Sequence, residues 1–166
     1  MTAAVAIPLL VLLVAFANPF IFSLFLAVVL FLALIEFNRM GLSKKHVAEQ
    51  WLAATAGTMS IPLLYMQRQE LLVPLFGGTI LILGVLFLFR FADLTTVHHR
   101  LSWLCLGFLY LPFLVGHLVE LRYQPDGRAW IFLTLLVIMV CDTFAYFVGS
   151  NLGKHKLYPS VSPNKS

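Results

Sequence analysis

The sequence begins with a long apolar stretch, residues 3–37, which reads AAVAIPLLVLLVAFANPFIFSLFLAVVLFLALIEF. It carries no charged side chain before Glu36. A helix of about 20 such residues crosses the hydrocarbon core of a bilayer. Asn18-Pro19 interrupts the stretch, and proline removes a backbone donor and disfavours helix in the residue before it. We therefore expect two membrane helices joined by a hairpin turn, with one tilted span over 3–37 as the alternative.

The composition of the whole chain points the same way. Of its 166 residues 61% are hydrophobic and only 11% are charged, and the mean hydropathy is +0.95. A soluble domain needs more polar side chains to cover its surface. No Lys or Arg precedes Arg39, so the start lacks the basic region of a secretory signal and is expected to remain in the membrane.

The pattern of apolar blocks predicts an all-α, polytopic integral membrane protein with about six transmembrane helices, or five if residues 3–37 form one span. A transmembrane domain would occupy residues 1–149, followed by a basic tail over 150–166. The expected helices are 3–17, 20–37, 47–66, 71–89, 101–119 and 129–149.

Small residues and turn residues suggest how these helices meet. Ala53 and Gly57 lie four apart and predict a close-packing face. Three further glycines are expected to offer small surfaces to neighbouring helices, and Pro125-Asp126-Gly127 is a strong turn signal. Those glycines are Gly77, Gly78 and Gly84. Cys105 and Cys141 have no nearby His or Cys at metal-ligand spacing, so we interpret them as apolar packing residues.

Positive charge is distributed unevenly among the connections. The connections after the second, fourth and sixth expected helices hold eight of the eleven Lys and Arg residues, and those after the first, third and fifth hold three. The eight are Arg39, Lys44, Lys45, Arg90, Arg100, Lys154, Lys156 and Lys165; the three are Arg68, Arg122 and Arg128. The bias predicts that the richer connections and both termini are cytoplasmic. The net charge of +4 is scattered, so we expect no nucleic-acid partner.

One ionisable residue lies within an expected membrane helix. Asp142 is flanked by LVIMVC and TFAYFV, and a charge at that depth usually faces a protein interior or a water-filled cavity. Tyr146 and Gly149 follow it on one helical stripe. A snorkelling or helix-pairing aspartate is the alternative. Glu36 could face the same cavity, although pairing with Arg39 is simpler.

The basic tail holds groups that bind phosphate oxygens. They are Lys154, His155, Lys156, Ser162, Lys165 and Ser166, near glycine-freed backbone amides. A nearby carboxylate would suit Mg²⁺, which prefers one or two carboxylates plus substrate phosphates. Contact with anionic lipid is the alternative for such a tail.

The sequence from Asp142 onward resembles that of phosphatidate cytidylyltransferases, also called CDP-diacylglycerol synthases. The matching pieces are DTFAYFVG at 142–149, GKHKL at 153–157 and SPNKS at 162–166. The resemblance implies condensation of CTP with phosphatidic acid, giving CDP-diacylglycerol and pyrophosphate with Mg²⁺. It assigns Asp142 a catalytic and metal-binding role, phosphate binding to three lysines, and hydrogen bonds to Ser162 and Ser166. His155 would donate to a phosphate or make a structural bond.

The chain also departs from that family. A second signature, a Lys-Asp stretch followed by Pro-Gly-His-Gly-Gly and Asp-Arg-x-Asp, is not in this sequence, which stops at Ser166. We therefore expect the N-terminal portion of a nucleotidyltransferase of the bacterial inner membrane, inactive alone, with membrane lipid and a second copy as further partners. The rival is a non-enzymatic membrane subunit, or part of a transporter, whose tail binds anionic lipid. His98 and His99 are expected to be solvated.

Overall fold

The computed structural model describes residues 10–42, 47–90 and 94–152. Residues 10–16 are helical, and the helices that follow are α2 (Pro19–Gly41), α3 (Val47–Tyr65), the short 3₁₀ helix η1 (Gln69–Leu71), α4 (Leu72–Arg90), α5 (Leu94–Tyr123) and α6 (Gly127–Leu152). No strand occurs in these ranges. The all-α prediction is confirmed.

Four stretches of the described helices are long and apolar enough to cross a membrane. They are Pro19–Gly41, Gln69–Phe89, Val97–Tyr123 and Gly127–Asn151. The protein is therefore a polytopic integral membrane protein. The α3 helix, with 19 residues, is not in this group and buries the polar residues Glu49, Gln50 and Ser60. That α3 and the helix before Asn18 also cross the membrane, which would give six spans, remains a prediction.

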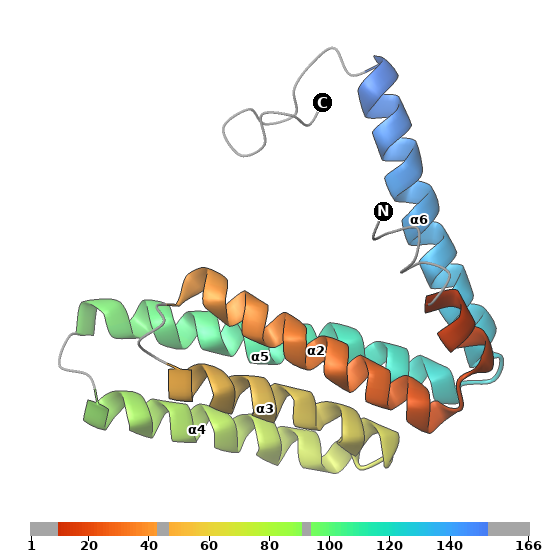
Figure 1. The fold of residues 1–166 in the computed structure, drawn as a ribbon. Helices are drawn as coiled ribbons and strands as arrows, with labels where there is room; N and C mark the ends of the chain where they lie inside the picture. The colour runs from red at the N-terminus through yellow and green to blue at the C-terminus, as the bar shows by residue number, and fades with distance from the viewer. Residues whose placement is uncertain (1–9, 43–46, 91–93, 153–166) are drawn as a thin grey trace.

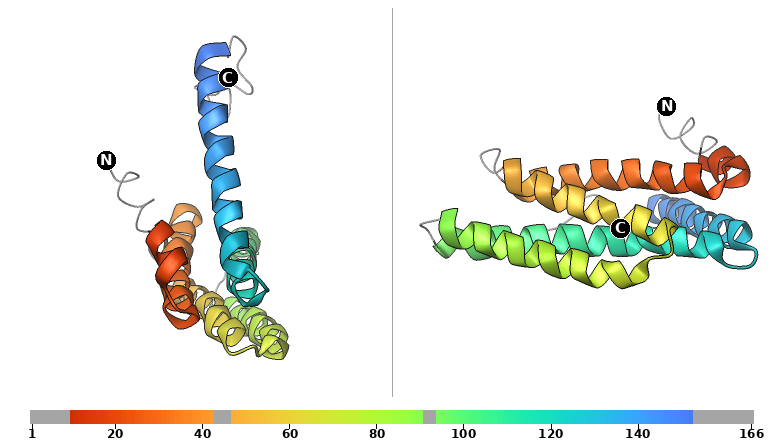
Figure 2. Two further views of the ribbon diagram at one scale, coloured as in Figure 1. Left: turned by 90° about the vertical axis from the view of Figure 1, so that its right-hand side faces the viewer. Right: turned by 90° about the horizontal axis from the view of Figure 1, so that it is seen from below.

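Helices α2 to α5 lie side by side, and α6 leaves this bundle at a steep angle (Figure 1). The α3 helix packs against α2, α4 and α5, and α5 packs against α2, α3, α4 and α6. The C-terminal ends of α2 and α4 lie at one end of the bundle with the starts of α3 and α5, and the α3–α4 and α5–α6 connections lie at the other end (Figure 1). The left view of Figure 2 shows α6 standing clear of the bundle over most of its length.

A seam of small residues lets the central helices approach closely. Ala53 and Ala54 are fully buried on α3. A Cβ atom added to Gly57 would lie 2.9 Å from Leu34 Cδ1 of α2 and 3.1 Å from Pro112 Cγ of α5. The predicted close-packing face of α3 is confirmed, and it contacts two helices at once.

The glycines of α4 behave differently from the prediction. A Cβ atom added to Gly77, Gly78 or Gly84 would meet no described atom within 4 Å. They therefore offer no packing surface to the described neighbours, and that expectation is wrong within this part of the chain. The α4 helix uses larger side chains instead, such as Leu83 and Phe87, which are buried.

Both predicted turns are present. Asn18 caps α2, because its side-chain oxygen accepts a hydrogen bond of 2.8 Å from the Ile21 amide, and Pro19 begins the helix. The α5–α6 turn passes through Asp126, whose φ of 57° lies in the left-handed region. At Gly127 a Cβ atom would collide with the carbonyl oxygen of Leu121, so this position requires glycine.

The ends of α5 differ from the sequence expectation of 101–119. The helix begins at Leu94 and continues to Tyr123, so His98, His99, Glu120 and Arg122 are helical residues. The reason is that apolar content marks the part of a helix that suits lipid, whereas the helix itself continues until the backbone leaves the helical conformation. His98 and His99 are exposed, and the ring of His99 stacks on Trp103 with centroids 6.2 Å apart.

Candidate functional site

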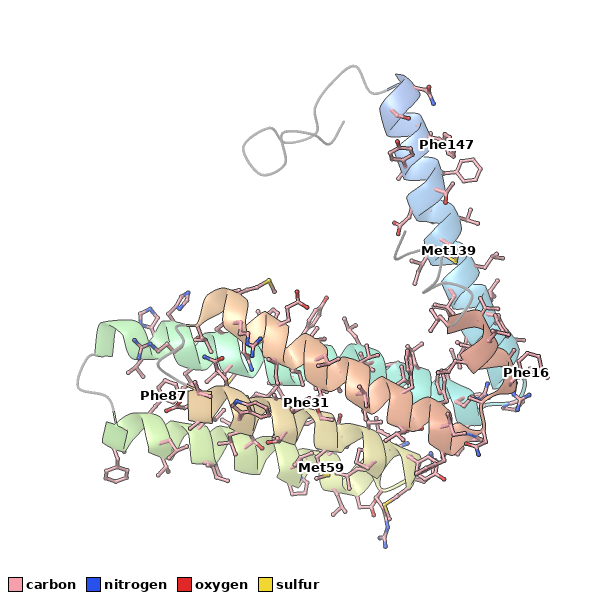
Figure 3. The ribbon with its side chains drawn as sticks, in the orientation of Figure 1. Phe16, Phe31, Met59, Phe87, Met139 and Phe147 are labelled. Carbon is pink, nitrogen blue, oxygen red and sulfur yellow. The ribbon has the colours of Figure 1, made fainter. Side chains whose placement is uncertain are left out.

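The predicted catalytic residue, Asp142, lies on the part of α6 that stands clear of the bundle. Its side chain is exposed, as are those of its neighbours Cys141 and Thr143. Figure 3 shows Met139 and Phe147 on the same part of α6, with no helix of the bundle beside them. The expectation that Cys141 packs is therefore not met among the described residues, whereas Cys105 packs against the core.

The stripe expected from Asp142 to Gly149 lies on one continuous helix, α6. Tyr146 is exposed one turn beyond Asp142, and its ring meets that of Phe147 edge-on at 5.9 Å. The polar side chains around the stripe bond to their own helix, with Thr143 Oγ1 donating to the Met139 carbonyl at 2.7 Å. The Asp142 carboxylate makes no hydrogen bond or ion pair with any described residue.

The predicted substrate-binding residues all lie outside the described ranges. They are Lys154, His155, Lys156, Ser162, Lys165 and Ser166. The α6 helix is described to Leu152, so the chain leads directly from Asp142 toward them. The structure does not pack α2 against α6, and so it does not bring Glu36 to Asp142.

The described residues fit a magnesium ion only in part. They contain no group of three His, Cys, Asp or Glu side chains that could hold a metal. Asp142 supplies a single carboxylate, whereas Mg²⁺ is usually held by one or two carboxylates together with substrate phosphates and water. The residues described can therefore contribute one ligand to such a site.

Sequence reasoning missed a buried polar cluster at the α2–α3 end of the bundle. Asn38 is fully buried and donates from Nδ2 to the Gln50 carbonyl at 3.2 Å, and Glu49 is buried beside Gln50 in the sequence. Trp103 Nε1 of α5 donates to the Phe37 carbonyl at 3.0 Å. These bonds tie α2 to α3 and α5. The feature of the sequence that could have revealed this cluster is the presence of amide and acid side chains within apolar helices.

A second missed feature is an apolar cavity of about 810 Å³ between α3, α4 and α5. At its polar end, Gln69 Nε2 of η1 donates to Glu120 Oε2 of α5 at 3.0 Å. The helix expected over residues 101–119 leaves Glu120 in the connection that follows it. The structure makes it a helical residue that lines the cavity.

The fold is that of an all-helical, polytopic membrane protein, and Asp142 is an ionisable residue within its apolar helix α6. The sequence matches the Cytidylyltransferase family over residues 1–166. The chain belongs to that family.

Named relatives of this chain are also cytidylyltransferases. The chain is 36% identical over 73 residues to the phosphatidate cytidylyltransferase of Bacillus subtilis, a segment covering 43% of this chain and 27% of that protein. It is 33% identical over 78 residues to the phosphatidate cytidylyltransferase of Staphylococcus saprophyticus, covering 47% of this chain and 26% of the relative. The chain thus spans about a quarter of the length of the relatives it matches. No solved structure matches it.

Proposed function

We propose that this chain supplies the membrane-embedded part of a CTP:phosphatidate cytidylyltransferase, which makes CDP-diacylglycerol and pyrophosphate. The observation that carries the proposal is the family match over residues 1–166, which includes Asp142 and the basic residues after it. The matched relatives in Bacillus and Staphylococcus are phosphatidate cytidylyltransferases. Both substrates carry phosphate, and one is a lipid, so the reaction suits a site at the membrane surface.

The chemistry requires charge neutralisation and positioning. A phosphate oxygen of the lipid attacks the α-phosphorus of CTP, a new phosphoanhydride bond forms, and pyrophosphate leaves. Such transfers depend on holding the reacting groups in line and offsetting their negative charge. In this proposal Lys154, Lys156 and Lys165 bind the phosphates, and the hydroxyls of Ser162 and Ser166 donate hydrogen bonds to them. His155 donates to a phosphate oxygen as well.

Asp142 serves in this proposal as a ligand for Mg²⁺ beside the substrate phosphates. When bound, the metal offsets phosphate charge and helps to orient the leaving group. Two observations support this role: the carboxylate makes no bond with any described residue, and it lies ten residues before the end of α6 at Leu152. We also propose that the α2–α3 and α4–α5 connections and the tail face the cytoplasm, where CTP is found. The positive-charge bias supports that orientation.

The test is CDP-diacylglycerol formation from labelled CTP in membranes that express the complete open reading frame. Asp142→Asn should lower the rate by about a hundredfold or more, because the metal that offsets the phosphate charge loses its carboxylate ligand. Asp126→Asn is the matched control. Asp126 is exposed in the α5–α6 turn, and asparagine tolerates its φ of 57°.

Two results would overturn the proposal. The first is a complete protein with an intact tail that forms no CDP-diacylglycerol. That result would favour the non-enzymatic alternative, in which the tail binds anionic lipid. The second is an Asp142→Asn variant as active as Asp126→Asn, which would remove the role given to the carboxylate.

A further inference from the structure

The cavity between α3, α4 and α5 has the composition of a lipid-binding groove. Apolar side chains of three helices line most of it, among them Leu64, Leu72, Phe76 and Leu109. Leu109 and Phe113 are exposed on α5, so the groove opens on an exposed apolar surface of that helix. From Ser102 to Glu120, α5 rises about 27 Å at about 1.5 Å per residue. That length is close to the roughly 30 Å of a hydrocarbon core, so the groove can receive an extended acyl chain.

Polar groups gather at one end of this groove only. Glu120 Oε2 accepts from Gln69, while Glu120 Oε1 is buried and has no hydrogen-bond partner among the described residues. His117, three residues earlier on α5, has its Nδ1 2.6 Å from the Phe113 carbonyl. A carbonyl can only accept, so Nδ1 carries the proton, and in that tautomer Nε2 is an acceptor. Both side chains line the cavity and present acceptors.

Two tyrosines, Tyr65 and Tyr123, lie at this end of the bundle. The Tyr123 hydroxyl donates to the Tyr65 carbonyl at 2.8 Å, and Phe20 packs edge-on against the Tyr65 ring at 5.8 Å. Tyrosines are enriched at the membrane–water interface. Arg68, next to Gln69 in the sequence, is exposed and forms a surface ion pair of 3.2 Å with Glu70. Arg68 therefore places a cation next in the sequence to Gln69, the residue that bonds Glu120.

We propose that this groove binds an aminophospholipid, with its primary ammonium on Glu120 and His117, its phosphate toward Arg68 and an acyl chain along α5. A primary ammonium has three donors, which suits the two acceptors at this end. In the described conformation Oε1 is covered, so the carboxylate turns about its terminal torsion, which is a broad one, to meet the ligand. An anionic lipid without an amine would bring like charge against Glu120.

This inference is independent of the proposed cytidylyltransferase reaction. It concerns α3, α4 and α5, and it requires neither CTP nor the tail. Binding can therefore be measured without enzyme activity, and the failure of either proposal leaves the other standing.

Native mass spectrometry of the purified protein in detergent tests the headgroup. Phosphatidylethanolamine, phosphatidylcholine and phosphatidylglycerol with identical acyl chains are added at equal concentration. The ethanolamine lipid should be retained about tenfold more than the glycerol lipid, the scale expected for a hydrogen bond to a charged group. The choline lipid should lie between them, because its quaternary ammonium has no N–H donor. Equal retention of all three lipids, or preference for phosphatidylglycerol, would overturn the proposal.

Two pairs of variants locate the site. Glu120→Gln should abolish the preference for the ethanolamine lipid, whereas Glu36→Gln, at an exposed position of α2, should keep it. Leu109→Trp should fill the groove and lower retention of every lipid severalfold, whereas Leu133→Trp on exposed α6 should not. Circular dichroism checks that each variant keeps its helix content. A preference that survives Glu120→Gln, or retention unchanged by Leu109→Trp in a folded protein, would refute the assigned site.

Discussion

Arg122 shows how one buried charge can organise a helix end. It is 8% exposed, and its two terminal nitrogens donate to the carbonyls of Val14 at 3.1 Å and Ala17 at 2.6 Å. Those carbonyls belong to the last turn of the helix before Asn18 and are otherwise unsatisfied. The guanidinium also lies 5.4 Å from the centre of the Phe22 ring. Arg122 therefore joins the end of α5 to the first hairpin.

Replacing Arg122 by lysine tests this role. Arg122→Lys keeps the charge but loses the planar fork that reaches two carbonyls. We expect a loss of about 1–3 kcal/mol of stability, the scale of a hydrogen bond to a charged group. The measurement is thermal unfolding in detergent. Arg128→Lys, at an exposed position of α6, is the control, and equal midpoints for the two variants would show that the fork does not matter.

At the scale of the elements, glycine has different consequences on two neighbouring helices. Gly57 of α3 faces Leu34 and Pro112 at contact distance, whereas Gly84 of α4 faces no described atom within 4 Å. The sequence presents both as glycines in apolar helices. Their different environments arise because α3 is surrounded by α2, α4 and α5, while α4 has one side open.

The same substitution at both glycines should separate these environments. Gly57→Leu overpacks the seam between α2, α3 and α5 and should destabilise the protein by about 1–3 kcal/mol or prevent folding. Gly84→Leu should be nearly neutral, because its side chain enters open space. Unfolding midpoints and the yield of monodisperse protein measure the difference. Similar losses at both positions would contradict the close-packed seam.

For the whole molecule, the two ends of the α2–α5 bundle should lie on opposite sides of the membrane. Met40 at the end of α2 and Met66 after α3 are both exposed and lie at opposite ends. In a background with Cys105 and Cys141 replaced by serine, Met66→Cys should react with an impermeant maleimide in intact cells. Met40→Cys should react only after permeabilisation. The reverse pattern would overturn the orientation inferred from positive charge.

In the whole molecule, α6 and the α2–α5 bundle have different surroundings. Leu133, Leu136 and Phe144 are exposed on α6, whereas residues of similar size are buried on α2. Hydropathy predicts both helices equally well, since lipid and a protein interior each favour apolar side chains. Which of them packs within the bundle is visible only in three dimensions.

The sequence predicted only those site residues whose local surroundings in the chain are unusual. Asp142 could be found, because a carboxylate in an apolar helix is costly and conspicuous. Glu120 could not be recognised as part of a groove, since its partner Gln69 lies 51 residues away. The bonds from Arg122 to Val14 and Ala17 span more than 100 residues and were equally hidden. Side-chain partners at such separations depend on how helices pack.

The sequence alone determined the membrane-embedded, all-helical class of this protein, its turns at Asn18 and Asp126, and its motif beginning at Asp142. These follow from local properties, namely hydropathy, turn chemistry and residue spacing. Only the tertiary structure decided which glycine needs close contact, where the groove beside Glu120 lies, and that α6 stands apart from α2–α5. The reason is that lipid-facing and buried helix faces are both apolar, so the sequence carries little sign of which face meets a neighbour.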